Sequence, residues 1–253
     1  MGMRVIQLHE AFGGRVTIDN RLESIIAARL FVEKHFPDCQ VALLAGSVVR
    51  AEATFNSDLD IVILKETASS YRESLIEFGW PIEVFVHSLL SYKLFFESDC
   101  KRARPSLPRM VAEGIVLKDV GVLEEIKQEA RMLLKKGPEK WTAEIIEMKR
   151  YSITDTLDDF IGSYNRSEDI FIANALADQL SEFISRVNQQ WIGASKWVFR
   201  SLRDFDEAFA AEFMAAFDLF YKTGEKIEVI QLAERILQPY GGRLFDGFSV
   251  GKK

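Results

Sequence analysis

The sequence has few cysteines and no long hydrophobic run, and each shortage removes a class of protein. Its only two cysteines, Cys39 and Cys100, stand far apart in the 253 residues. Neither a disulfide framework nor a zinc-binding spacing can be built from them. No apolar stretch reaches about 18 residues, the length that suggests a membrane-spanning helix. The N-terminal residues lack the apolar centre and cleavage site of a secretory signal. We therefore expect a cytoplasmic protein without a membrane partner.

The sequence also lacks an excess of positive charge. Its 32 basic residues are outnumbered by 38 acidic ones, which gives a net charge of −6. Proteins whose main partner is DNA or RNA usually present a basic surface, so this balance argues against nucleic acid. One local exception is the basic segment, residues 101–109, which has four cations and no acid. This segment either lines the path of a triphosphate or forms a solvated loop.

Strand and helix patterns alternate in the first half of the chain. A helix is expected over residues 19–36, capped by Asp19 or Asn20, with one apolar face: Leu22, Ile25, Ile26 and Leu30. Short apolar runs predict four strands, at residues 40–45, 59–64, 82–86 and 114–118. Serines at positions 69 and 70 suggest the start of a helix that ends at Gly79. A further helix is expected between His87 and Asp99.

Beyond residue 119 only helical patterns remain. A helix is expected at residues 123–136, before the breaker Gly137-Pro138. Three further helices each carry one apolar face: the first has Ile153, Leu157, Phe160 and Ile161, the second Leu176, Leu180, Phe183, Ile184 and Val187, and the third Phe209, Phe213, Phe217 and Phe220. The predicted fold class is α+β. A domain of residues 1–119, with a mixed sheet flanked by helices, precedes an all-helical domain of residues 120–253.

Two aspartates interrupt the apolar strand at residues 59–64. Asp58 and Asp60 are two positions apart, so both side chains project from the same face of a strand. Two carboxylates held so close repel each other unless a cation lies between them. Oxygen ligands favour a hard ion such as Mg²⁺, which often completes its coordination with phosphates. An isolated pair of this kind can equally be two solvated aspartates at a strand end.

The surroundings of this pair favour a phosphate site. Gly46-Ser47 follows a buried strand, and we expect it to open a helix. Glycine lets a phosphate approach the backbone, the helix N-terminus offers free N–H groups, and the Ser47 hydroxyl adds a donor. A third acid, Glu83, interrupts the strand at residues 82–86 and is costly there unless it faces a cation or solvent.

The pattern G-S-x-x-R-x-E-A-x-x-x-S-D-L-D-I-V, residues 46–62, resembles the signature of the DNA polymerase beta-like nucleotidyltransferases. The likeness is greatest to small bacterial enzymes of that superfamily, among them the aminoglycoside adenylyltransferases. The chain departs from the family at Ala51, where a glycine usually follows the arginine. The order of elements up to residue 119, followed by a helical domain, is similar to the same family.

The resemblance implies that Asp58, Asp60 and Glu83 hold two Mg²⁺ ions and that Gly46 and Ser47 bind the phosphates of a nucleoside triphosphate, with ATP expected. An acceptor hydroxyl would attack the α-phosphorus and release pyrophosphate. Glu83 has a second possible role as general base. Arg50 is interpreted either as a ligand of phosphate or Asp58, or as a surface arginine. The acceptor would be a small hydroxylated, aminoglycoside-like molecule.

Several weaker candidates lie elsewhere in the sequence. His87 is interpreted as a surface or turn histidine. Asp155, Asp158 and Asp159 fall opposite the apolar face of their helix, either towards solvent or lining a cleft with Lys149 or Arg150 on phosphate. The tryptophan-containing stretch at residues 190–197 is interpreted as helix packing.

Two other functions compete with the enzyme. One is a non-catalytic regulatory protein, such as an antitoxin-like module that acts by binding a partner. The other is transfer of the nucleotide to a protein or to RNA. The complete acidic set favours catalysis, the negative net charge argues against RNA, and the sequence leaves the oligomeric state open.

Overall fold

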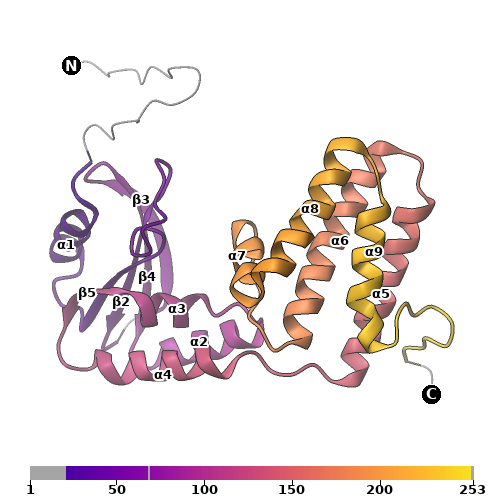
Figure 1. The fold of residues 1–253 in the computed structure, drawn as a ribbon. Helices are drawn as coiled ribbons and strands as arrows, with labels where there is room; N and C mark the ends of the chain where they lie inside the picture. Colours follow the sequence, from indigo (N-terminus) through magenta and orange to yellow (C-terminus); the bar gives the residue numbers. More distant parts are fainter. Residues whose placement is uncertain (1–20, 68, 252–253) are drawn as a thin grey trace, which may run out of the picture. The chain divides into compact units, whose positions relative to one another are not determined.

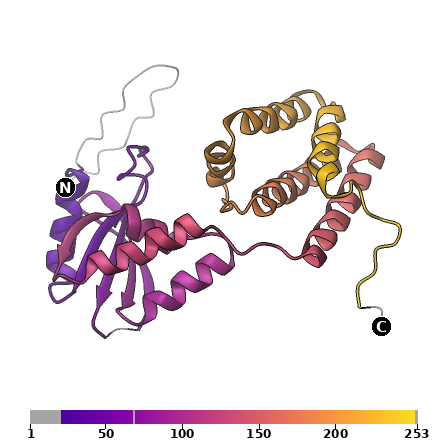
Figure 2. The same cartoon turned by 60° about the horizontal axis from the view of Figure 1, so that its bottom comes forward.

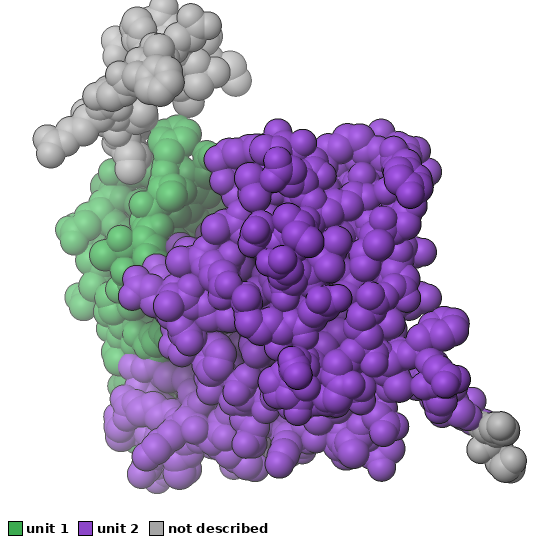
Figure 3. Space-filling model, turned by 45° about the vertical axis from the view of Figure 1, so that its right-hand side comes forward, with its two compact units in different colours: residues 1–89, 113–123 green, residues 90–112, 124–253 purple. Residues whose placement is uncertain are grey.

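The computed structural model describes residues 21–67 and 69–251, and divides them between two compact units, coloured separately in Figure 3. The sheet unit comprises residues 1–89 and 113–123, and the helical unit comprises residues 90–112 and 124–253. The predicted fold class, a mixed sheet with helices together with a helical C-terminal region, is confirmed. The predicted domain boundary at residue 119 stays a prediction. No helix in the described ranges is both long and apolar enough to cross a membrane.

Among the described residues, five strands form one mixed sheet in the order β3-β4-β2-β1-β5. Figure 1 shows the sheet and labels four of these strands. The strands are β1 (Val41–Ala45), β2 (Leu59–Lys65), β3 (Tyr71–Glu77), β4 (Trp80–Ser88) and β5 (Ile115–Asp119). β2 pairs in parallel with β4, and the other neighbours are antiparallel. The interior strand β1, between β2 and β5, is buried along its whole length, as expected of a continuous apolar run.

The helix α1 (Ser24–His35) packs on one face of this sheet, with a buried side that differs from the predicted one. The residues facing the core are Ala27, Ala28, Phe31 and Val32. Of the predicted face, Ile25 is partly buried against this core, whereas Leu22, Ile26 and Leu30 are 42%, 46% and 39% exposed. The two alanines let the helix backbone approach the sheet, and Phe31 and Val32 fill the remaining space. The expected caps, Asp19 and Asn20, lie outside the described residues.

The segment after Ser70 is a strand, so the predicted helix ending at Gly79 is wrong. β3 pairs with β4 through a two-residue turn, Phe78-Gly79, in which both residues have positive φ, at 52° and 77°. This combination matches the right-handed twist of a hairpin. The sequence pattern failed here because β3 is a sheet edge and leaves most of its side chains exposed.

The helical unit contains α2 (Ser91–Lys101), α3 (Ser106–Glu113), α4 (Leu123–Lys136), α5 (Ala143–Gly162), α6 (Arg166–Val187), α7 (Lys196–Phe205), α8 (Glu207–Thr223) and α9 (Ile227–Leu237). α2 and α4 lie side by side (Figure 2), where the Tyr92 hydroxyl donates to Glu129 at 2.8 Å. The helix α3, which occupies the second half of the basic segment, was not predicted. The helix at residues 123–136 is confirmed by α4.

A single apolar core holds α5, α6, α8 and α9 together. The predicted helix faces supply much of this core, including Leu157, Phe160, Leu180 and Phe220, which are fully buried. Phe160 and Phe220 meet edge to face with 5.0 Å between ring centroids. Their helices begin at side-chain caps, such as Asp206, whose carboxylate accepts the Phe209 N–H at 2.9 Å. Of the predicted faces, Ile161 is the member left exposed.

Candidate functional site

The turn after β1 brings the backbone against the acidic strand β2. Gly46 has φ of +79°, and a Cβ at this position would lie 1.9 Å from Oδ2 of Asp60. Any side chain would therefore collide with the carboxylate as well as strain the backbone. Ala45 and Asp60 are paired in the sheet, which fixes the approach. Glycine is required at this point because the turn and an acidic side chain share the same space.

The residues that follow Gly46 form a turn, so the predicted helix is wrong. The Glu52 N–H donates to the Ser47 carbonyl at 3.0 Å, which closes the turn after five residues. Ala51 has φ of 57°, in the left-handed region. Glycine would adopt this conformation without the steric cost that the alanine Cβ brings. The buried Ser47 hydroxyl donates to Ser57 at 3.1 Å.

Three acidic side chains converge at the start of β2 and in the middle of β4. Asp58 comes directly before β2, and Asp60 faces Glu83 across the parallel pair. Asp58, Asp60 and Glu83 are half-buried, and one oxygen of each lies within 4.8 Å of the others. The sequence placed the two aspartates together, and the strand register adds Glu83. A set of three carboxylate oxygens fits a hard divalent ion such as Mg²⁺.

The surroundings of Asp60 raise the pKa of its carboxyl group. Burial raises the pKa of Asp60 to about 6, and the carboxylates of Asp58 and Glu83 add to the rise. Arg50 and Arg72 oppose it. A bound cation would relieve the repulsion that these three acids exert on one another.

Arg72 on β3 is the residue of this site that sequence reasoning missed. Its guanidinium pairs with Glu83 and lies over the Phe85 ring, 5.0 Å from the centroid. Ser74, opposite Glu83 in the sheet, donates to the same carboxylate at 3.2 Å. Because a helix was predicted for this segment, neither the Arg72 contact nor the Ser74 contact with Glu83 was expected. The Phe78-Gly79 turn between two short segments was the available signal for a hairpin.

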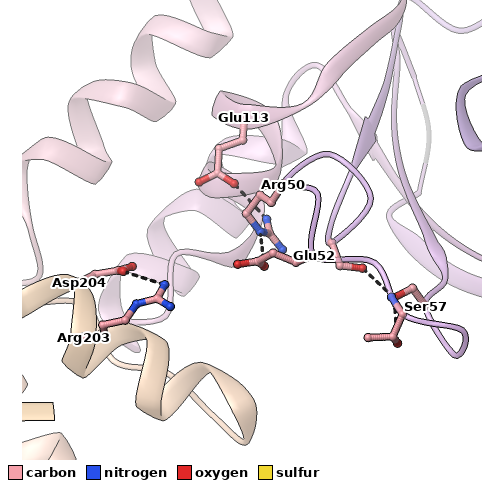
Figure 4. Close-up of polar contacts among 8 residues, drawn as sticks. Arg50, Glu52, Ser57, Glu113, Arg203 and Asp204 are labelled. Carbon is pink, nitrogen blue, oxygen red and sulfur yellow. Dashed lines mark hydrogen bonds and ion pairs between the residues drawn. The ribbon is translucent and has the colours of Figure 1, made fainter. Parts of the chain in front are cut away.

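Arg50 lies between two acids of the same unit (Figure 4). Its Nε is 3.3 Å from Glu52 and its Nη1 is 3.0 Å from Glu113, at the end of α3. These contacts hold the guanidinium in place next to the turn. They make Arg50 a fixed part of the site, while its predicted contact with phosphate remains a prediction.

The other sequence candidates lie apart from the acidic cluster. His87 is buried at the end of β4, with Nδ1 3.3 Å from the Ser70 hydroxyl, so its prediction as a surface histidine is wrong. His87 lies within β4, opposite the buried Leu64 of β2, so it belongs to the sheet and not to a turn. In the helical unit, Asp155, Asp158 and Asp159 are exposed as expected, and Asp158 pairs with Arg243.

The remaining cations of the helical unit are mostly engaged. Lys149 pairs with Glu182, and Arg150 donates to the carbonyls of Gly241 and Gly242 at 2.8 and 2.9 Å. In the basic segment Arg102 pairs with Asp99, and Arg109 lies over the Trp197 ring, 5.7 Å from its centroid. In the tryptophan-containing stretch Trp191 donates to the Leu134 carbonyl at 2.9 Å, a packing role.

Comparisons with known proteins give little beyond this geometry. No family model matches the chain, and no curated protein matches it. Among solved structures, it is similar to a nucleotidyltransferase-like protein from Exiguobacterium sibiricum 255-15. The two are 11% identical over 86% of this chain and 74% of the other, with a TM-score of 0.45. At that level structural likeness says nothing about a reaction, so function has to be inferred from the carboxylates and the motif.

Proposed function

We propose that the chain is a Mg²⁺-dependent nucleotidyltransferase that moves a nucleoside monophosphate from a nucleoside triphosphate to a hydroxyl of a small molecule. The observation that carries this proposal is the convergence of Asp58, Asp60 and Glu83 beside the Gly46 turn. The G-S…D-L-D pattern at residues 46–60 supports it, because the same residues supply the turn and two of the three acids.

The three carboxylates would hold the metal ions. When bound, the ions would neutralise the triphosphate and lower the pKa of the acceptor hydroxyl. Arg72 and Ser74 would orient Glu83, since both already contact its carboxylate. Arg50, fixed by Glu52 and Glu113, would place a positive charge beside the phosphates.

The proposed step forms one bond and breaks another at the α-phosphorus. The acceptor oxygen bonds to this atom as the bond to the oxygen bridging the β-phosphate breaks, and pyrophosphate leaves with that oxygen. The proton of the acceptor hydroxyl passes to a carboxylate of the cluster or to water. Gly46 lets the turn lie against Asp60, and the Ser47 hydroxyl, which donates to Ser57 in this structure, would have to rotate to donate to a phosphate oxygen.

For the acceptor, the proposal extends only to its chemical class. The helical unit has a cavity of about 670 Å³ whose lining includes Asp159 and Glu168, and also Asp158, which is already paired with Arg243. Such an acidic lining suits a cationic, hydroxyl-rich molecule, which agrees with the aminoglycoside-like acceptor that the sequence motif suggests.

Calorimetric titration with ATP and with GTP tests nucleotide binding. Wild type should bind at least one of them only in the presence of Mg²⁺, and Asp58→Ala and Asp60→Ala should each abolish that binding. Glu73→Gln is the matched control, because Glu73 is an exposed acid of β3 whose sheet partner is Val84 rather than Glu83. Identical titrations for wild type and both aspartate variants would refute the catalytic assignment.

Release of pyrophosphate then identifies the acceptor. Hydroxylated amines and polyols are supplied with the preferred nucleotide and Mg²⁺, and a true acceptor should release pyrophosphate in proportion to its own modification. Nucleotide binding without any release from such a panel would favour the regulatory, partner-binding function instead.

A further inference from the structure

A second cavity lies within the helical unit, at residues that the proposed reaction does not use. It encloses about 300 Å³, the lower end of the range for small-molecule sites. Its walls come from the turn after α2, from one side of α6 and from the loop before α7. The residues that carry the argument are Arg104, Asp178, Gln179, Glu182 and Ser195.

The backbone around this cavity is held firmly. The Ile192 N–H donates to the Ala103 carbonyl at 2.9 Å, which ties the loop before α7 to the turn that carries Arg104. The Arg104 N–H donates to the Asp99 carbonyl at 3.0 Å. A Cβ on Gly193 would lie 2.0 Å from the Trp197 carbonyl, so this loop packs directly on the start of α7. The walls are therefore built before any ligand arrives.

The charges that line the cavity are only partly neutralised by the protein. Glu182 is paired with Lys149. Arg104 and Asp178, by contrast, form no side-chain hydrogen bond or ion pair with any residue in the described ranges, although both line the same space. The side chain of Gln179 donates to Thr156 at 3.0 Å, but its buried amide oxygen accepts nothing from the described residues.

This arrangement selects a ligand by charge. A dianion would face the carboxylates of Asp178 and Glu182, and a dication would face Arg104, so either would meet a like charge. A molecule with one anionic and one ammonium group can satisfy both sides at once. Its anionic group would pair with Arg104, and its ammonium would donate to Asp178.

We propose that the cavity lined by Arg104, Asp178 and Gln179 binds a small zwitterion of amino-acid type. The volume of about 300 Å³ admits one such molecule and excludes a nucleotide-sized one held entirely within it. The hydroxyl of Ser195 and the backbone of the loop before α7 supply neutral hydrogen-bonding groups for the rest of the ligand. The site is independent of the acidic cluster in the sheet unit.

Calorimetry on the full chain with the standard amino acids, each alone at millimolar concentration, tests this proposal. O-phosphoethanolamine is added as a second arm, because it offers phosphate in place of carboxylate. At least one zwitterion should bind, and acetate and ethylamine, which each carry one of the two charges, should bind about tenfold more weakly or not at all. No binding by any zwitterion, or equal binding by the single-charge compounds, overturns the proposal.

Substitutions of the residues that line the cavity test whether the zwitterion binds there. Arg104→Gln and Asp178→Asn should each weaken binding about tenfold or more, because each removes a charged partner. Arg104→Lys should retain part of the affinity. Arg131→Gln and Asp155→Asn, exposed charges of the same unit outside the cavity, are the matched controls and should leave binding unchanged. Unchanged binding in both cavity variants would overturn the site.

Two readouts keep the result interpretable. Circular dichroism should show that the Arg104 and Asp178 variants fold like wild type, as expected for two exposed side chains. Asp58→Ala should retain zwitterion binding in full. Loss of zwitterion binding in Asp58→Ala would contradict an independent site, whereas failure of nucleotide binding would leave this inference untouched.

Discussion

At the scale of single residues, the acidic cluster joins two aspartates from the start of β2 to a glutamate from the neighbouring strand β4. Members of the cluster that are close in the chain could be predicted from the sequence. Asp58 and Asp60 share one short motif, and Glu83 stands out as a charge within an apolar strand. Arg72 was not predictable in the same way, because its contact with Glu83 depends on the register of two strands. The prediction of His87 as a surface or turn residue failed for a related reason, because the burial of a side chain at a strand end depends on which other elements cover it.

Gly46 should tolerate no side chain. Gly46→Ala adds a left-handed alanine and a clash with Asp60, and we expect it to lower the free energy of unfolding by about 2–5 kcal/mol. Gly121→Ala is the control: its φ is +98°, but nothing lies within 4 Å of the added Cβ. It should cost only about 1–2 kcal/mol. Urea titrations measure both variants, and equal losses would mean that the contact with Asp60 is unimportant.

Ala51 presents the opposite case, a side chain where glycine would fit better. Its left-handed backbone costs about 1–2 kcal/mol, and glycine gives back about 0.5–1 kcal/mol through its freedom in the unfolded chain. Ala51→Gly should therefore raise the melting temperature by roughly 1–4 °C. Ala211→Gly, at an exposed position within α8, should instead lower it. A lower melting temperature for Ala51→Gly would show that the turn is not strained.

At the scale of elements, the site depends on three adjacent strands, of which β3 was read wrongly. Apolar runs revealed β1, β2 and β4 because these strands are buried. β3 exposes most of its side chains, so no hydrophobic period marks it. The helices with a strong apolar face were predicted well. The face of α1 was not, since apolar residues surround much of that helix and packing with alanine decided which side is buried.

The strands together predict an unusual response to pH. The pKa of Asp60 is raised from 3.8 to about 6, so the folded state holds this proton more tightly than the unfolded state does. The contribution of Asp60 to the stability of the metal-free protein should thus be fully present below pH 3.8 and be lost as the pH rises through about 6. Stabilisation by Mg²⁺ should run the other way and disappear as pH falls through about 6, because protonation neutralises a ligand.

Melting temperatures with and without Mg²⁺, measured between pH 5 and pH 8, would show both trends. The variant Arg72→Gln removes a charge that lowers the pKa of Asp60, so the midpoint of the Mg²⁺ effect should move to higher pH. Arg72→Lys, which keeps the charge, should leave the midpoint close to that of wild type. If the pH midpoint of the Mg²⁺ effect is the same in Arg72→Gln as in wild type, Arg72 of β3 does not influence the charge of the site.

At the scale of the whole molecule, the helical unit and the sheet unit each have an apolar core among the described residues. Phe160 is fully buried in the helical core, whereas Phe171 of the same unit is 75% exposed. Phe160→Ala should lower the stability of the helical unit by about 3–5 kcal/mol, and Phe171→Ala should have little effect. Tryptophan fluorescence during urea unfolding measures this difference, because Trp141, Trp191 and Trp197 all lie in the helical unit. Equal destabilisation by both variants would contradict the core assignment.

The sheet unit is built from two separate stretches of chain, and this has a consequence for how the protein is made. The strand β1 pairs with β5, with Val41 opposite Asp119, so this pairing cannot form before residue 119 has been synthesised. When the first 89 residues have left the ribosome, the edge of β1 that pairs with β5 is still without a partner. Residues 90–112 must be synthesised next, before β5 can complete the sheet. A nascent chain halted before residue 115 should thus expose an unpaired, fully apolar strand and recruit chaperones, which a chain released after residue 123 would not.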